Sequence, residues 1–476
     1  MSPLAVLATI LAYFAAIAFI SWLSGRKAGG SDVFYRGGRS SHWAVVAFAM
    51  IGSCMSGVTF VSVPGMVGES GFGYLQMCIG FFLGYLVIAF VLTPLYFRLD
   101  VVSIYEYLER RFGLGAYRTG AWFFFISKML GASVRLFLVC LTLQLLLFGP
   151  LGLPLWVNVA VNVAVCLLYT WRSGVRSVIW TDLLKTLCMI VAVTLCVVLI
   201  GKDLGGIRIQ EKVFWLDDVN HPQFFWKQLL GGLFTVVAMT GLDQDMMQRT
   251  LSCKDYRDSQ KNLIVSSLLQ TVVIALFLCL GALLYQFAAA HGISERGDSL
   301  FPAVATSGLL PGIVGVLFVL GLVASAYGAG GSALTSLTTS FTVDILRKKD
   351  DAKVRRWVHL GMAVLMGVTI LVFNALNSTS AIDAVYKLAS YTYGPILGLF
   401  AFGILTRKQV KDRYVPLVAI AAPLLCLVLQ LNSERWFGGY RFSYELLLLN
   451  AALTFLGLLL IVRRDGPRTP APDGRR

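Results

Sequence analysis

Long apolar segments recur along the whole chain, and no other feature restricts its fold as strongly. A helix needs roughly 20 mostly apolar residues to cross a lipid bilayer, and these segments are of that length. Of the 476 residues, 57% are hydrophobic and 14% are charged, which leaves too few polar side chains to cover a water-soluble globule. We therefore expect an all-α polytopic membrane protein with about 13 transmembrane helices. The segments lie near residues 3–24, 42–66, 74–97, 119–147, 153–170, 177–200, 226–247, 263–289, 311–345, 357–375, 381–405, 414–431 and 444–462.

Lysine and arginine residues gather in alternate connections between the segments. One set of connections contains Arg26 and Lys27 after the first segment and the basic run 347–356, whereas the opposite set contains few basic residues and includes Asp217-Asp218. Cytoplasmic connections retain positive charge during insertion. The pattern predicts an integral membrane protein, in a bacterial cytoplasmic membrane, with its N-terminus outside and its C-terminus inside.

The same arrangement explains the net charge of +15. The basic residues flank helices, and no basic patch interleaved with aromatic residues remains for nucleic acid. The cysteines and histidines show no spacing typical of a metal centre or a disulfide framework. The chain also lacks HExxH, GxSxG in a catalytic context and a nucleotide-binding loop, so we expect neither an enzyme nor an ATP-driven pump, and no cofactor.

Two segments are interrupted by small residues at corresponding positions. The second contains the run Gly52 to Gly57 and then Pro64-Gly65, and the seventh contains Gly231-Gly232 and Thr240-Gly241. This spacing indicates two five-helix blocks related as inverted repeats, whose broken helices meet at a solute site in the middle of the membrane. An alternative is that the small residues only permit close helix packing.

This organisation divides the chain into five parts. They are an N-terminal helix with a basic loop (1–40), a first repeat (41–200), a second repeat (201–406), two C-terminal helices (407–463) and a basic tail that we expect to be disordered (464–476).

Four motifs, in order along the chain, resemble the sodium:solute symporter family. The resemblance covers essentially the whole chain and implies a LeuT-like fold, with a five-plus-five inverted repeat, and solute uptake coupled to sodium. The motifs are the run from Gly52 to Gly65, the segment from Gly174 to Asp182, the stretch from Gln244 to Arg249 and the segment from Ser340 to Asp344.

The resemblance also implies where sodium would bind. The principal sodium ion would lie between backbone carbonyls that match Gly52 and Met55 and two hydroxyl side chains of the ninth helix. Those two hydroxyl positions fall on Gly328 and Ala329, so this half of the site is missing. A hard cation needs several oxygen ligands, and we expect weak sodium binding.

A second sodium site, present in some members of the family, matches Asp182, Gly331 and Ser332, of which only Asp182 and Ser332 carry a side-chain oxygen. Lys185 follows Asp182 by three residues and lies on the same helix face. Its ammonium group would replace the sodium ion or would carry a coupling proton. The alternative is a lysine whose side chain extends to the cytoplasmic interface.

Arg135, in the middle of the fourth segment, is the candidate for binding the solute. A guanidinium inside a membrane is costly without an anionic partner, and arginine binds carboxylates in a bidentate manner. Its position resembles the substrate-carboxylate arginine of the sialic acid transporters, whose polar ligands match Ser56, Thr59 and Gln76. Alternatively, Arg135 pairs with a carboxylate of the protein or reaches a water-filled vestibule.

Three further charged residues are expected to lie away from the solute. Lys128, two helical turns before Arg135, is interpreted as a vestibule or interfacial lysine. Asp243 and Asp245, near the inner end of the seventh segment, are expected to interact with the basic loop that follows.

Together these features predict a secondary active transporter. It would take up a small carboxylate-bearing solute, sialic acid or another organic anion, by alternating access, with Na⁺ or H⁺ as the coupling ion. The alternatives are a sodium-independent or proton-coupled transporter built around Lys185, and a membrane solute sensor, for which the short tail leaves no signalling domain. The expected partners are the solute and the lipid bilayer, without nucleic acid or an obligate protein partner.

Overall fold

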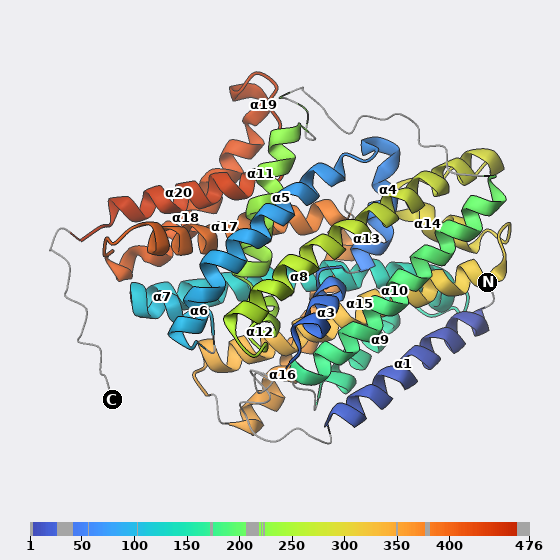
Figure 1. The fold of residues 1–476 in the computed structure, drawn as a ribbon, viewed down its shortest axis with the longest axis horizontal. Coiled ribbons are helices and arrows are strands. Elements are labelled where there is room, and N and C mark those ends of the chain that lie inside the picture. Colours follow the sequence, from blue (N-terminus) through green and yellow to red (C-terminus); the bar gives the residue numbers. More distant parts are fainter. Residues whose placement is uncertain are drawn as a thin grey trace.

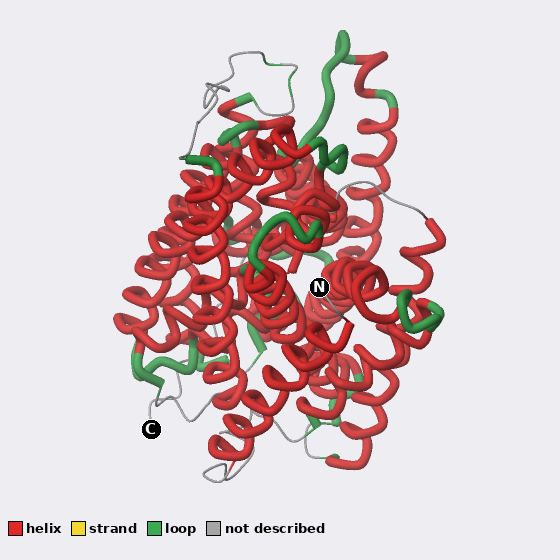
Figure 2. The backbone as a smooth tube through the Cα atoms, turned by 90° about the vertical axis from the view of Figure 1, so that its right-hand side faces the viewer, coloured by secondary structure: helices red, strands yellow, loops and turns green. Residues whose placement is uncertain are grey.

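The computed structural model describes most of the chain. The described residues are 3–25, 41–55, 57–101, 103–171, 175–205, 219, 221, 224–348, 351–376 and 381–463. Within these ranges the chain forms helices and their connections, and its only β-type pairings are two isolated bridges. Figure 2 shows this all-helical arrangement. The prediction of an all-α fold is therefore confirmed for the described residues.

Most helices are joined by short connections. The first half of the described chain contains α1 (Pro3–Gly25), α3 (Trp43–Cys54), α4 (Gly57–Ser70), α5 (Tyr74–Val87), α6 (Thr93–Leu99), α7 (Glu106–Arg111), α8 (Leu114–Leu143), α9 (Leu155–Thr170) and α10 (Val175–Asp203). The second half contains α11 (Phe225–Val236), α12 (Gln244–Thr250), α13 (Tyr256–His291), α14 (Leu300–Thr306), α15 (Gly312–Ser340), α16 (Ala352–Leu376), α17 (Ala381–Leu405), α18 (Val415–Leu431), α19 (Ser433–Trp436) and α20 (Leu446–Leu460).

The described helices are long and apolar enough to cross a membrane repeatedly. Eight pass this test alone, and two bent pairs bring the number to ten. Three shorter apolar helices, Leu7–Phe19, Leu155–Leu168 and Leu446–Leu460, coincide with further predicted spans. Repeated spans of this kind are typical of a polytopic membrane protein, while the count of about 13 spans stays a prediction.

The two bent pairs occur at the second and seventh predicted segments. The α3 helix ends at Cys54, and Met55 adopts an extended conformation with φ −94° and ψ 125°, which interrupts the helical hydrogen bonds. The axes of Trp43–Cys54 and Thr59–Ser70 then differ by 60°. The second pair, Phe225–Gly241 and Gln244–Thr250, is bent by 74°. Both helix interruptions predicted from glycine-rich runs are therefore present.

The first bend is surrounded by α10, α15 and α8. The α10 helix packs against both α3 and α15, and α15 also packs against α8. Figure 1 shows α3, α10, α12 and α15 together in the middle of the bundle, with α20 at the opposite edge from α1. Close approach is possible because Gly52 lacks a side chain: a Cβ there would lie 2.9 Å from the carbonyl oxygen of Asp182. This packing brings the α10 residues near position 182 to the break.

Candidate solute and cation site

A large cavity lies between the end of α4, the middle of α8 and the α14 region. Its volume is about 1360 Å³. Glu69, Glu295 and Asp298 are among its lining residues, whereas no lysine or arginine belongs to the described lining. This part of the molecule therefore offers a water-accessible space with acidic walls.

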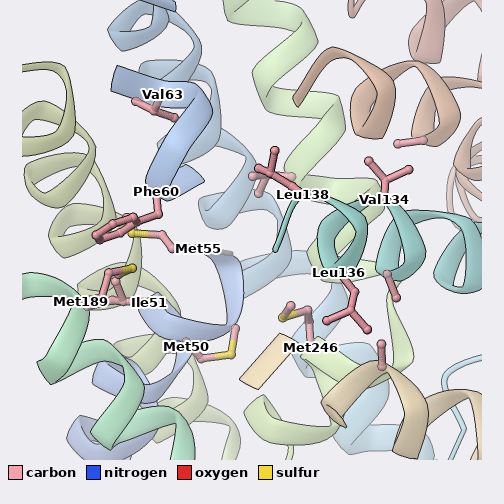
Figure 3. Close-up of a cluster of buried hydrophobic side chains, with 14 of the residues drawn as sticks. Met50, Ile51, Met55, Phe60, Val63, Val134, Leu136, Leu138, Met189 and Met246 are labelled. Carbon is pink, nitrogen blue, oxygen red and sulfur yellow. The ribbon is translucent and has the colours of Figure 1, made fainter. Parts of the chain in front are cut away.

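Two of the predicted solute ligands lie just beyond the lining of this cavity. Ser62 of α4 and Leu138 of α8 line it, and Thr59 and Arg135 each precede one of these residues by one helical turn. Figure 3 shows Leu138 and Leu136 on one side of Met55, at the break, and Phe60 and Met189 on the other. Val134, the residue before Arg135, also lines the cavity, so the cavity extends to the level of Arg135.

The Arg135 side chain has no hydrogen-bond or ion-pair partner in the described part of the chain. It is partly exposed, and among the described residues no hydrogen bond or ion pair reaches its guanidinium. The alternative that Arg135 pairs with a carboxylate of the protein is therefore wrong within the described part of the chain. Gln76 is fully buried on α5, and Ser56 lies outside the described residues.

The residues at the predicted principal sodium position provide few oxygens. Ser325 of α15 lies next to the break, with its Oγ 3.6 Å from the position of a Cβ on Gly57. Ser332, two turns later on α15, contacts Asp245. Gly328 and Ala329 come between these two serines in the sequence and bring no hydroxyl group. Beside the carbonyls of Gly52 and Met55, this side-chain set does not fit a sodium ion, which needs several oxygen ligands.

At the second predicted sodium position, the side chain of Arg249 contacts the candidate sodium ligands. Asp182 is buried, accepts a hydrogen bond from the Ser53 hydroxyl at 2.9 Å, and lies 3.2 Å from the Arg249 guanidinium. Arg249 also donates a hydrogen bond to Ser332 and lies 3.4 Å from Asp245. Both surviving candidate ligands, Asp182 and Ser332, therefore contact a guanidinium.

The sequence interpretation missed the role of Arg249. A signal was present, because Arg249 follows Asp245 by four residues, the spacing at which helical side chains meet. Its contact with Asp182 joins α12 to α10 across 67 positions of sequence, which no local pattern indicates.

Lys185 is completely enclosed, with 0% of its surface exposed. Its Nζ has no hydrogen-bond partner among the described residues. The charged or polar groups close enough to act on it electrostatically include Asp182, Arg249, Arg135 and Cys54. The alternative in which Lys185 extends to the cytoplasmic interface is therefore wrong, because the ammonium lies inside the bundle beside the break.

Lys128 also differs from its expected position. It is buried, with its Nζ 3.1 Å from Asp243 and 3.0 Å from Asp245, and Tyr393 of α17 donates a hydrogen bond to Asp243 at 2.7 Å. Lys128 is thus not a vestibule or interfacial lysine. Asp243 pairs with Lys128 rather than with the basic loop, whereas Asp245 pairs with Lys128 and also with Arg249, at the start of that basic stretch. The reason is the bend before α12, which turns the first residues of this helix into the bundle toward α8 and α17.

The charged side chains around the break do not balance. Three carboxylates face four basic groups, which leaves one positive charge in surplus when all are ionised. The two basic groups without a hydrogen-bonded partner among described residues are Arg135 and Lys185. The seven residues are Asp182, Asp243, Asp245, Lys128, Arg135, Lys185 and Arg249. No group of three His, Cys, Asp or Glu residues in the described ranges is arranged to hold a metal ion.

Known proteins resemble this chain over most of its length. The mouse sodium-coupled monocarboxylate transporter 1 is 27% identical over 425 residues, which cover 84% of this chain and 68% of the relative. The Aliivibrio fischeri sodium/sialic acid symporter NanT is 27% identical over 451 residues, covering 87% of this chain and 86% of the relative. These relatives are solute transporters and not enzymes.

A solved structure shares the fold. A Na⁺-coupled sialic acid symporter, substrate-bound and outward-open, superposes with a TM-score of 0.79 at 19% sequence identity, covering 97% of this chain and 99% of the other. A family model described as "Sodium:solute symporter family" matches residues 34–412. The all-helical spans, the two broken helices and these matches agree, and the chain belongs to the sodium:solute symporter family, as an integral membrane transport protein with a LeuT-like fold.

Proposed function

We propose that this protein is a secondary active transporter that takes up a small carboxylate-bearing solute by alternating access. The observation that carries this proposal is Arg135, a guanidinium within the bundle that no described residue pairs with. Unpaired charges inside a membrane protein are costly and mark solute or ion pathways. A planar guanidinium is well suited to a carboxylate.

The shape of the protein supports access from one side at a time. The cavity of about 1360 Å³ extends from one end of the bundle to the level of Arg135, since Val134, the residue before it, belongs to the lining. At the other side of Arg135, Lys128, Asp243 and Tyr393 tie α8, α12 and α17 together. We assign the cavity to the outer face, in keeping with the predicted outside N-terminus.

The relatives narrow the chemical class of the solute. One is a monocarboxylate transporter and another a sialic acid symporter, and a carboxylate is the group that these solutes share. We propose that this group contacts Arg135, with Thr59, Ser56 and Gln76 as candidate ligands for the rest of the solute.

Arg135→Gln should abolish the stabilisation of purified protein by its carboxylate solute. The measurement is the shift in melting temperature on adding N-acetylneuraminate or L-lactate, each paired with its uncharged amide. Losing a hydrogen bond to a charged group costs about 1.5–3 kcal/mol, which corresponds to roughly 10–100-fold weaker binding. Arg135→Lys should retain part of the shift, because it keeps the charge without the bidentate geometry.

Arg110→Gln serves as the control variant, because Arg110 is exposed on α7. It should respond like the wild type. The carboxylate assignment fails if Arg135→Gln binds with unchanged affinity, or if an amide stabilises the wild type as well as its acid does.

Flux separates a transporter from a solute sensor. Proteoliposomes containing only this protein should accumulate the labelled acid that stabilises it, and unlabelled acid should compete. Binding without flux would support the sensor.

A further inference from the structure

Lys185 is a buried cation without a hydrogen-bond acceptor among the described residues. Its exposure is 0%, and its Nζ has no partner. Asp182, one turn earlier on α10, is not its partner, because that carboxylate binds Arg249 and Ser53. Enclosing an ammonium group in this way is unfavourable unless an anion compensates its charge.

The location of Lys185 relates it to the predicted sodium position. The neighbouring residue Thr186 donates a hydrogen bond to the carbonyl of Phe48, and a Cβ on Gly52 would collide with its hydroxyl. This turn of α10 therefore lies directly against the last turn of α3, where the carbonyls of the break begin. Lys185 is therefore close enough to Cys54 and Arg135 to interact with both electrostatically.

A sodium ion fits this site poorly, because few side-chain oxygens are available to bind it. The two α15 positions that the family resemblance matches to sodium ligands, Gly328 and Ala329, have no side-chain oxygen. Half of the expected oxygen ligands are missing from this site, and an ammonium group lies beside it. The ammonium group repels a cation, and the remaining oxygens are too few to bind one.

We propose that Lys185 provides, as part of the chain, the positive charge that sodium provides in the sodium-coupled relatives. Solute binding then depends on Lys185 and Arg135 together and does not require Na⁺. This inference rests on the proposed function, since it assumes an anionic solute. The surplus positive charge around the break is the charge that one carboxylate neutralises.

Sodium binding tests the inference without any knowledge of the solute. Purified wild-type protein should show no saturable binding of radiolabelled sodium. Its stabilisation by N-acetylneuraminate or L-lactate should be equal in sodium chloride and in potassium chloride of the same ionic strength. Saturable sodium binding, or stabilisation that needs sodium, overturns the proposal.

Variants of Lys185 test its charge. Lys185→Gln should weaken binding of the acid by about tenfold or more, because it removes an unscreened charge near the anion. Lys185→Arg keeps the charge and should bind better than Lys185→Gln. Lys202→Gln, at the exposed outer end of the same helix, should behave as the wild type. Equal affinity in wild type and Lys185→Gln contradicts the proposal.

The two proposals fail in different ways. If no carboxylate stabilises the wild type in either salt, the proposed function is wrong, and the sodium measurement still decides whether the chain binds this ion. If the acid binds and needs sodium, the proposed function stands and the role of Lys185 is wrong. If Lys185→Gln does not fold, Lys185→Arg and the wild-type sodium measurement decide.

Discussion

At the residue scale, Asp243 both caps a helix and accepts hydrogen bonds from two other helices. It caps the N-terminus of α12, where its Oδ1 accepts the backbone N–H of Asp245 at 2.9 Å. It also accepts hydrogen bonds from Lys128 and Tyr393. The cap could be anticipated from an aspartate before a short helix, but its buried partners could not.

Asp243→Asn should preserve the cap and lose the charge that balances Lys128. We expect the free energy of unfolding to fall by up to about 3 kcal/mol, since a hydrogen bond to a charged group is lost in a buried setting. Asp412→Asn is the matched control. Asp412 accepts the backbone N–H groups of Gly115 and Ala116 at the start of α8, and none of its hydrogen bonds comes from a buried lysine.

The measurement is thermal or denaturant unfolding of both variants in the same detergent. The control should lose less than about 1 kcal/mol. Equal losses in the two variants would mean that the Lys128 contact contributes nothing beyond capping.

At the element scale, the sequence predicted the helices and their breaks better than it predicted the contacts between individual side chains. Apolar length and glycine-rich interruptions predicted most helices and both breaks, because these are local properties of the chain. The partners of Lys128 and Asp182 depend on how α12 turns into the bundle, and they are 115 and 67 positions away along the chain. For that reason Arg135 and Lys185 were identified as unusual charges, whereas the role of Arg249 was not.

Glycines also determine how closely α5 and α11 approach. A Cβ on Gly84 would lie 2.6 Å from the carbonyl oxygen of Leu233, and a Cβ on Gly232 would collide with the carbonyl oxygen of Met77. The two helices therefore pack backbone against backbone, which membrane helices do at small residues.

Gly232→Ala should push α5 and α11 apart and lower the stability by about 1–3 kcal/mol. Gly131→Ala on α8 is the control, because a Cβ there meets no atom within 4 Å. It should be neutral or stabilising by up to about 1 kcal/mol, from helix propensity alone. Melting temperatures of the two purified variants decide, and a stable Gly232→Ala would show that the helices separate without cost.

At the scale of the whole molecule, one end is open and the other is held together by charges. The large cavity lies at one end, and the contacts of Lys128 with Asp243 and Asp245 join α8 to α12 on the far side of Arg135. Opening of that second end requires these contacts to separate.

Lys128→Met should therefore favour the conformation in which the cavity is closed. A cysteine introduced at Thr142, which lines the cavity, reports on this equilibrium through its labelling by a membrane-impermeant maleimide. We expect labelling to slow several-fold in Lys128→Met, after subtraction of the signal from native cysteines. Lys261→Met, at an exposed lysine of α13, should leave the rate unchanged. Unchanged labelling in Lys128→Met would indicate that the contacts do not hold that end closed.

The role that we propose for the buried Lys185 has a further consequence, which concerns the electrical work of transport. A sodium ion that travels with a carboxylate cancels its charge and is left inside, whereas a lysine belongs to the protein and returns with the empty carrier. Each monoanion taken up would then move one negative charge inward. An inside-negative membrane opposes this movement by about 2.3 kcal/mol for each 100 mV. Such a carrier would draw its driving force from the solute's own gradient, from an inward proton, or from the exit of another anion in exchange.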